Sequence, residues 1–183
     1  INKNNKSIEI ISMGHRNPQG LTIDKDTNLI YSSEHGPKGG DEINTIDTTK
    51  TIQNYGWPIS SYGEHYGNEK KDNSKLYKIA PLFKSHKDYG FIEPTKNYTP
   101  SIGISELILF DMLNQKILLA SSLGNNVSEG DMSLHIYFFD KENLKKYKSI
   151  TLNERIRDML YLEKKNLIIL FLESTSSIGV IKL

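Results

Sequence analysis

The sequence predicts an all-β protein and, within that class, a β-propeller built from four-stranded blades. Short apolar runs of about five to eight residues recur along the chain, separated by residues that favour turns. No segment of more than about ten residues repeats its apolar positions with the period of a helix. An internal repeat then favours a propeller over a sandwich or a barrel, because a propeller repeats one sheet radially.

The repeat consists of a strand, a corner that carries an arginine, a second strand, a turn and a third strand. Its first copy, residues 6–31, has Arg16 at the corner, and its second copy, residues 148–169, has Arg155 there. One further set of four strand-like runs, residues 104–152, lies between the copies. These sets amount to about three blades, and a propeller needs at least four blades to close. We therefore expect residues 1–183 to be the C-terminal part of a single larger propeller domain.

The individual strands are expected where apolar and β-branched residues alternate or run together. They are residues 7–13, 21–24, 29–33, 42–47, 104–111, 116–122, 134–140, 147–152, 156–162, 166–173 and 178–183. The stretch 59–97 is different, because it is rich in Tyr, Lys, Gly, Asn and Ser and has no sustained periodicity. We expect a loop insertion there, with short local structure around residues 76–83.

Composition excludes several classes of function. The 23 Lys and Arg residues nearly balance 22 Asp and Glu residues, and no long basic run occurs, so we expect no nucleic-acid partner. The sequence has no cysteine, which excludes disulfides and thiolate metal sites. The longest apolar run, Leu167 to Leu172, is far too short to span a membrane.

Polar, cationic and turn-forming residues concentrate in three blocks around two short strands. The blocks read GHRNPQGL (14–21), SEHGPKGGDEIN (33–44) and NYGWP (54–58). The segment from Gly36 to Gly40 contains three glycines and a proline, which predicts a tight turn with exposed backbone groups. Loops held by a rigid sheet are where binding and catalytic groups usually lie, so we expect the functional site here.

Three groups of residues in and beyond these blocks suit an anionic ligand or a cation. Arg16 and Asn17 offer the planar donors that match carboxylates, although a structural corner has about equal weight from the residues themselves. The carbonyl groups of Gly36 and Pro37 suit a hard cation such as Ca²⁺, the alternative being a plain propeller loop. Arg155 and Arg157 point to the same side if the segment is extended, which suits a carboxylate clamp or a solvated strand face.

The three blocks, in this order and spacing, resemble the soluble quinoprotein glucose and aldose sugar dehydrogenases, which use pyrroloquinoline quinone (PQQ) and Ca²⁺. The resemblance implies a six-bladed propeller that oxidises the C1 hydroxyl of an aldose to a lactone, in the periplasm or outside the cell. The electron acceptor stays open. The resemblance also implies that the general-base histidine lies in an N-terminal half, so that residues 1–183 hold no catalytic residue and are inactive by themselves.

The resemblance assigns residues to the cofactor and to the metal. Those implied at PQQ are Arg16, Asn17, Ser101 in a Pro-Ser element, and Arg155 and Arg157 in an RxR element, with Glu34 expected to line the pocket at a strand end. The carbonyls of Gly36 and Pro37 are implied at the Ca²⁺ that also binds PQQ. Glu42 and the carbonyl of Tyr55 are implied at a second, structural Ca²⁺.

One departure from the family pattern leaves other functions open. The family usually has a lysine after a Ser-Leu pair, where it reaches a PQQ carboxylate, but here Gly124 follows Ser122 and Leu123. This absence favours an alternative, a non-catalytic propeller that binds sugar or a protein partner. A third possibility is a propeller hydrolase of the lactonase type, in which side-chain carboxylates hold the metal.

Overall fold

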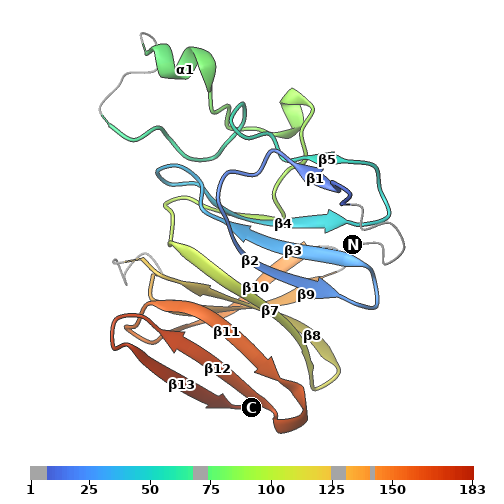
Figure 1. Ribbon diagram of the computed structural model, residues 1–183, viewed down its shortest axis with the longest axis vertical. Helices are drawn as coiled ribbons and strands as arrows, with labels where there is room; N and C mark the ends of the chain where they lie inside the picture. The colour runs from blue at the N-terminus through green and yellow to red at the C-terminus, as the bar shows by residue number, and fades with distance from the viewer. Residues whose placement is uncertain (1–7, 68–73, 125–130, 141–142) are drawn as a thin grey trace.

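Three antiparallel sheets follow one another along the chain. The computed structural model describes residues 8–67, 74–124, 131–140 and 143–183. The first sheet has the order β2 (Pro18–Asp24), β3 (Leu29–Glu34), β4 (Asp41–Asp47) and β6 (Lys96–Tyr98). The second contains β7 (Ile104–Met112), β8 (Gln115–Ser122), β9 (Ser133–Asp140) and β10 (Asn143–Thr151). The third contains β11 (Ile156–Leu162), β12 (Leu167–Leu172) and β13 (Ser177–Lys182). Figure 1 shows the sheets stacked from the top of the view to the bottom.

The minor elements are short. β1 (Ser12–Met13) and β5 (Gln53–Asn54) form a parallel pair, and η3 (Glu163–Lys165) joins β11 to β12. The expected strand 7–13 is correct only at its end, because Ile8 and Ile10 are exposed and lie outside any sheet; residue 7 lies outside the described residues. None of the described helices has the length and apolar composition needed to cross a membrane.

The first strand of each sheet packs against the first strand of the next. β7 lies between β2 and β11, as the packing of radially arranged blades requires. Gly20 on β2 allows the close approach, because a β-carbon there would lie 2.6 Å from the backbone nitrogen of Leu107 on β7. The expected all-β fold with four-stranded antiparallel sheets is therefore confirmed, whereas the number of blades in a closed ring stays a prediction.

The core lies in two layers between the three sheets. Successive residues of β7 serve both layers, because side chains alternate across a strand. Leu107 packs with Tyr31 and Leu118 between the first and second sheets, while Ile108 packs with Ile168 between the second and third. This arrangement fixes the ends of the strands, where the site residues are attached.

The stretch 59–97, expected to be a loop insertion, is tied to the first sheet by local structure. It contains α1 (Lys75–Ile79) and η1 (Lys87–Tyr89), and it ends inside β6, which pairs with β4. Phe83 donates a backbone hydrogen bond to Ile59 (2.9 Å), and Ser61 donates one to Phe83 (2.9 Å). Figure 1 shows α1 and its flanking loops above the first sheet.

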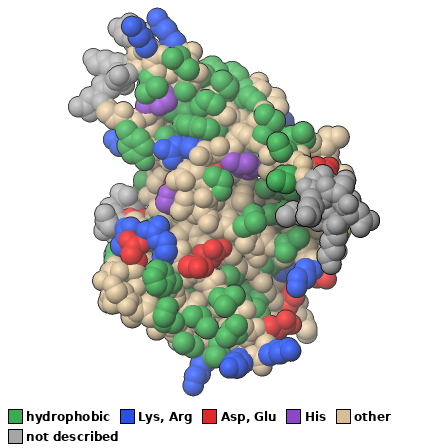
Figure 2. Space-filling view, in the orientation of Figure 1, with side chains coloured by type: hydrophobic (Ala, Val, Ile, Leu, Met, Phe, Trp, Pro, Cys, Tyr) green, Lys and Arg blue, Asp and Glu red, His purple; other side chains and the backbone are tan. Residues whose placement is uncertain are grey.

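The third sheet has an apolar outer face. By the register of β11, β12 and β13, Leu160, Phe171, Ile178 and Val180 lie on one face, and all four side chains are exposed. Figure 2 shows hydrophobic side chains at the lower end of the molecule, with Lys and Arg at the rim. An apolar sheet face of this kind is typical of a surface that packs against another element.

Candidate functional site

The residues expected at the site lie at one end of the stacked sheets. Arg16 and Asn17 precede β2, Ser101 precedes β7 and Arg155 precedes β11, while Gly36 follows the end of β3. In each antiparallel sheet, the start of the first strand and the end of the second meet at the same edge. The topology therefore gathers segments that are far apart in the sequence.

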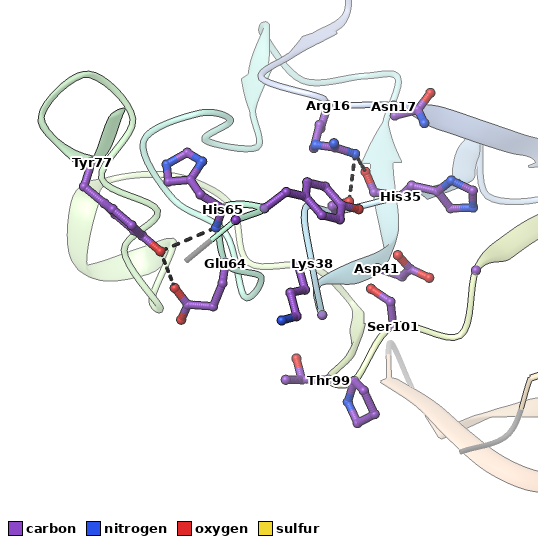
Figure 3. A pocket seen from close by; sticks show the side chains of 16 residues that line it. Arg16, Asn17, His35, Lys38, Asp41, Glu64, His65, Tyr77, Thr99 and Ser101 are labelled. Atoms are coloured by element: carbon purple, nitrogen blue, oxygen red, sulfur yellow. Dashed lines mark hydrogen bonds between the residues drawn. The ribbon is translucent and has the colours of Figure 1, made fainter. Parts of the chain in front are cut away.

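A pocket of about 940 Å³ opens at this end (Figure 3). Arg16, Asn17, Gly36 and Ser101 all line it, so the structure brings together four residues that the sequence nominated. Asp41 lies deeper, and its carboxylate accepts a hydrogen bond from the backbone N–H of Ile104 (2.9 Å), which joins the first sheet to the second. The pocket thus rests on two sheets.

Arg16 is held in one position by four contacts. Its Nη1 donates hydrogen bonds to the carbonyls of His35 (3.0 Å) and Gly36 (2.7 Å), which Figure 3 marks. Its guanidinium lies 5.4 Å from the ring centroid of Trp57, a cation–π geometry. Its backbone N–H donates to the carboxylate of Glu34 (2.8 Å). Among the described residues, Nε and Nη2 have no hydrogen-bond partner and can donate to a ligand.

Glu34 acts beneath Arg16 and does not line the large pocket. Its side chain is buried, and its second oxygen accepts a hydrogen bond from Asn44 (2.9 Å). The ring of His15 lies 3.7 Å from the oxygen that also binds the backbone of Arg16. Glu34 lines the small cavity beside the turn and holds the backbone of Arg16, and its contact with the cofactor stays a prediction.

Gly36 and Pro37 form the tight turn that the sequence predicts. The Pro37 carbonyl accepts a hydrogen bond from the Gly40 N–H (3.1 Å), and a β-carbon on Gly36 would overlap the Gly40 carbonyl. A carbonyl oxygen has two lone pairs, so the oxygens of Gly36 and Pro37 can each still ligate a hard cation. Gly36 lines the large pocket, so its oxygen suits an ion that also meets a ligand there. In the described residues, no three His, Asp or Glu side chains gather as a metal-binding group.

Glu42, Tyr55 and His86 surround a small enclosed cavity beside the turn. His86 donates through Nδ1 to the carbonyl of Tyr55 (2.8 Å), and its Nε2 lies 3.5 Å from a carboxylate oxygen of Glu42. Burial raises the pKa of Glu42, and His86 offsets part of that rise. Burial by itself would lower the pKa of His86, but the facing Glu42 carboxylate raises it above its ordinary value.

Arg155 and Arg157 reach the same side, as the two-residue period predicts, but they share a carboxylate of this chain. Both donate to Glu173, Arg155 from Nε (3.1 Å) and Arg157 from Nε (2.7 Å). The hydrogen bond from Arg157 is the main reason why the pKa of Glu173 lies below its ordinary value. Neither arginine lines the large pocket. Arg155 donates from Nη1 to the carbonyl of Leu123. The N–H of Leu123 in turn donates to Gly103 (2.7 Å), which does line the pocket.

An acidic side chain lies beside Gly124, the residue at which the resembled family usually has a lysine. A side chain on Gly124 would collide with the carboxyl group of Asp131. The Gly124 N–H donates to the carbonyl of Ile102 (3.0 Å), which places this acid beside the segment that carries Ser101. The carboxyl group of Asp131 therefore occupies the space into which a side chain at residue 124 would project.

The insertion supplies pocket residues that the sequence reasoning missed. Glu64, His65, Tyr66 and Tyr77 line the side of the pocket away from Asn17 (Figure 3). The Tyr77 hydroxyl donates to Glu64 (2.6 Å), and the His65 ring meets the edge of the Tyr77 ring at 4.5 Å between centroids. No periodic pattern marks these residues; the adjacent polar and aromatic trio Glu64–Tyr66 was the available signal.

Comparisons with known proteins identify the family of the chain. The glucose/sorbosone dehydrogenase family matches residues 1–178. Aldose sugar dehydrogenase YliI of Escherichia coli (strain K12) is 45% identical over 67 residues, which are 37% of this chain and 17% of that protein. Quinoprotein glucose dehydrogenase B of Acinetobacter calcoaceticus is 44% identical over 59 residues, which are 32% of this chain and 12% of that protein.

The fold likeness covers the full chain. The crystal structure of the soluble aldose sugar dehydrogenase from Escherichia coli, in its apo-form, matches with a TM-score of 0.74 at 24% identity. The match covers 100% of this chain and 50% of that one, so the chain spans about half the length of this structure. The resemblance carried by the three sequence blocks is thereby confirmed, and the chain belongs to the glucose/sorbosone dehydrogenase family.

Proposed function

We propose that this chain provides one wall of a PQQ- and Ca²⁺-dependent aldose dehydrogenase that oxidises the C1 hydroxyl of a sugar to a lactone. The observation that carries the proposal is the pocket in which Arg16, Asn17, Gly36 and Ser101 meet. The quinoprotein named among the relatives supports the choice of cofactor. In this proposal the chain is the C-terminal half of a six-bladed propeller in the periplasm or outside the cell, and the exposed apolar face of the third sheet packs against a further blade.

The pocket residues fit a planar polar cofactor. Arg16 offers Nε and Nη2, Asn17 offers an amide, and Ser101 offers a hydroxyl, so donors and acceptors converge from two sheets. Arg155 and Arg157 extend this donor set beyond Leu123, with Glu173 keeping the two guanidinium groups side by side. When bound, PQQ supplies the carbonyl chemistry that accepts a hydride from the sugar.

Arg16 has the clearest role in the reaction. Its guanidinium is a fixed positive charge, oriented by Trp57 and by the carbonyl of Gly36 before any ligand arrives. A fixed charge of this kind stabilises negative charge that develops on a neighbouring oxygen, without a cost of reorganisation. The carbonyl of Gly36 would hold Ca²⁺ on the same side, and the ion would add to this stabilisation. The proposal assigns the general base to no residue of this chain.

The insertion supplies the sugar-facing wall in this proposal. Glu64 provides a carboxylate that can accept hydrogen bonds from sugar hydroxyls, and Tyr66 and Tyr77 provide aromatic surface beside it. The ion pair between Lys84 and Glu64 (2.8 Å) and the hydroxyl of Tyr77 hold the carboxylate in place.

The test is a titration of the full-length protein, with both halves of the propeller present, with PQQ in the presence of Ca²⁺, followed by absorbance. We expect saturable uptake of one PQQ per molecule, and a loss of affinity of at least about tenfold in Arg16→Met, because a charged hydrogen bond is worth about 1.5–3 kcal/mol. Lys50→Met is the matched control, since Lys50 pairs with Asp47 (3.2 Å) away from this pocket. The absence of uptake by the wild type, or equal affinity in both variants, would contradict the proposal.

A second candidate function has its own structural support. Asp131 lies where a side chain at residue 124 would project, so the carboxylates of PQQ would meet an acid instead of the family's lysine. This arrangement favours a propeller that binds sugar without the cofactor. Calorimetric binding of glucose by PQQ-free protein, together with no uptake of PQQ, would establish this second function in place of the first.

A further inference from the structure

His86 lies in the insertion and faces two oxygen atoms, one in the block 33–44 and one in the block 54–58. Its side chain is 2% exposed, and its Nδ1 is 2.8 Å from the carbonyl oxygen of Tyr55. A carbonyl oxygen only accepts, so Nδ1 carries a hydrogen and donates. Its other nitrogen, Nε2, faces a carboxylate oxygen of Glu42 at 3.5 Å. One imidazole therefore donates to the carbonyl of Tyr55 and lies beside the carboxylate of Glu42, the two groups that the family resemblance assigns to a second, structural calcium ion.

The surroundings fix the imidazole in this position. The ring of Tyr62 stacks on it with 5.5 Å between centroids, and the backbone N–H of His86 donates to Glu93 (2.9 Å). The same oxygen of Glu93 accepts a hydrogen bond from the N–H of Lys87 (2.9 Å), which holds the start of η1. Hydrogen bonds of its own segment thus hold His86 in place, in addition to its hydrogen bond to Tyr55 and its position beside Glu42.

The space between these groups is small, and a ring nitrogen of His86 faces it from one side. The cavity that Glu42, Tyr55 and His86 line with Glu34 and Pro37 has a volume of about 10 Å³. Such a cavity holds about one water molecule. Calcium takes roughly six to eight oxygen ligands at about 2.3–2.6 Å, whereas the imidazole occupies one side of this space with nitrogen atoms.

Each acid of the cluster also has a histidine beside it. Glu34 and Glu42 are two buried carboxylates, and the amide of Asn44 lies between them, 2.9 Å from the first and 3.5 Å from the second. Buried carboxylates of this kind need a positive or hydrogen-bonding partner. His15 faces Glu34 and His86 faces Glu42, so each acid has its own imidazole.

We propose that His86 takes the place of the second calcium ion, so that Glu42 and the carbonyl of Tyr55 are joined by an imidazole and bind no divalent cation. A metal-free link then fastens the insertion, and with it the wall formed by Glu64 and Tyr77, to the first sheet. In consequence, a chelator removes calcium only from the large pocket, at the carbonyl of Gly36, and leaves the wall in place.

The test counts calcium ions per protein molecule after dialysis against Ca²⁺, in the absence of PQQ and sugar. We expect wild type and Glu42→Gln to bind the same number of ions. Glu106→Gln is the matched control, because it makes the same change from carboxylate to amide outside the cluster. The Glu106 carboxylate accepts a hydrogen bond from the backbone N–H of Leu107 (2.8 Å). One ion fewer in Glu42→Gln than in wild type and Glu106→Gln overturns the proposal. The count does not depend on PQQ, so its outcome is separate from that of the proposed dehydrogenase function.

A second measurement requires no variant. In nuclear magnetic resonance spectra of chelator-treated wild-type protein, we expect the imidazole resonances of His86 to stay unchanged when Ca²⁺ is added. Resonances of backbone groups near Gly36 are the ones expected to shift. Displacement of the His86 imidazole signals by Ca²⁺ would show that the ion competes for Glu42 and Tyr55, and the proposal would then be wrong.

Discussion

The carboxylate of Glu34 accepts a hydrogen bond from the backbone N–H of Arg16 at 2.8 Å, and this contact joins the end of β3 to the corner before β2. Because Glu34 is buried, its role is to fix the path of the chain that carries Arg16. Glu34→Gln keeps the shape but leaves one of two donors, Arg16 N–H or Asn44 amide, without its charged acceptor. We expect the affinity for PQQ to fall about tenfold, which corresponds to about 1.4 kcal/mol.

The measurement is again the absorbance titration with PQQ. Glu163→Gln serves as the control, since Glu163 lies in the exposed helix η3 at the far end of the third sheet. A Glu34→Gln protein that folds and binds PQQ as tightly as the wild type would show that Arg16 does not depend on this carboxylate. Direct cofactor contact by Glu34 would instead make the loss much larger than in a positioning role.

Glu34 favours PQQ binding by positioning Arg16, whereas Glu173 opposes it, because Glu173 competes with any ligand carboxylate for Arg155 and Arg157. It binds Arg155 and Arg157 at once, and Arg157 holds the pKa of Glu173 below its ordinary value. We expect Glu173→Gln to free both guanidinium groups and to strengthen PQQ binding about threefold, if the cofactor's carboxylates reach them. Arg157→Gln should weaken it. Affinities that do not change in either variant would place this pair outside the cofactor site.

The sequence predicted the fold and the pocket better than it predicted the contacts around the pocket. Arg16 and Ser101 were assigned to one site by the family resemblance, and the structure explains why they meet, because each precedes the first strand of a sheet at the same edge. His86 could not be placed, because 31 residues and a stretch without periodicity separate it from Tyr55. The shared use of Glu173 by two arginines also depends on the register of β11 and β12, which a single sequence does not determine.

An ion pair between the first and second sheets predicts a pH dependence of stability. Lys116 on β8 binds the buried carboxylate of Asp24 on β2 at 2.6 Å. Burial opposes ionisation of Asp24, but the hydrogen bond from Lys116 and others outweigh it, so its pKa lies below the ordinary 3.8. A lowered carboxyl pKa stabilises the fold above the unfolded value, and that stabilisation is lost as pH falls through the folded value.

Lys116→Met should therefore lower the free energy of unfolding by about 1 kcal/mol at pH 7. The difference from wild type should shrink as pH falls below 3.8, because Asp24 becomes protonated first in the unfolded chain and then, at lower pH, in the folded protein. Urea unfolding at pH 7 and at pH 3 measures it, with Lys50→Met, in its exposed pair with Asp47, as the control. A difference that stays constant between the two pH values would rule out this ion pair as its source.

Close packing of β2 on β7 makes Gly20 sensitive to any added side chain. In Gly20→Ala, the new methyl group would lie 2.6 Å from the Leu107 nitrogen and 2.7 Å from the Ser105 carbonyl, and both are backbone atoms that cannot rotate away. Overpacking of this kind costs about 1–3 kcal/mol. We expect a loss near the upper end of that range in urea unfolding. Gly179→Ala is the control, because its nearest neighbour is a flexible side-chain atom of Leu172 at 3.1 Å.

We expect a change in the wall formed by the insertion to alter binding of the sugar and to leave the affinity for PQQ unchanged. Tyr77 holds Glu64 through its hydroxyl at 2.6 Å, and Tyr77→Phe removes this hydrogen bond while keeping the ring against His65. In the active full-length dehydrogenase, we expect KM for the aldose to rise about fivefold, or about 1 kcal/mol, with kcat and PQQ affinity nearly unchanged. Tyr89→Phe is the control, because Tyr89 stacks on Phe83 outside the pocket. A fall in kcat with unchanged KM would instead place Tyr77 close to the reacting atoms, and the wall would then serve the chemical step.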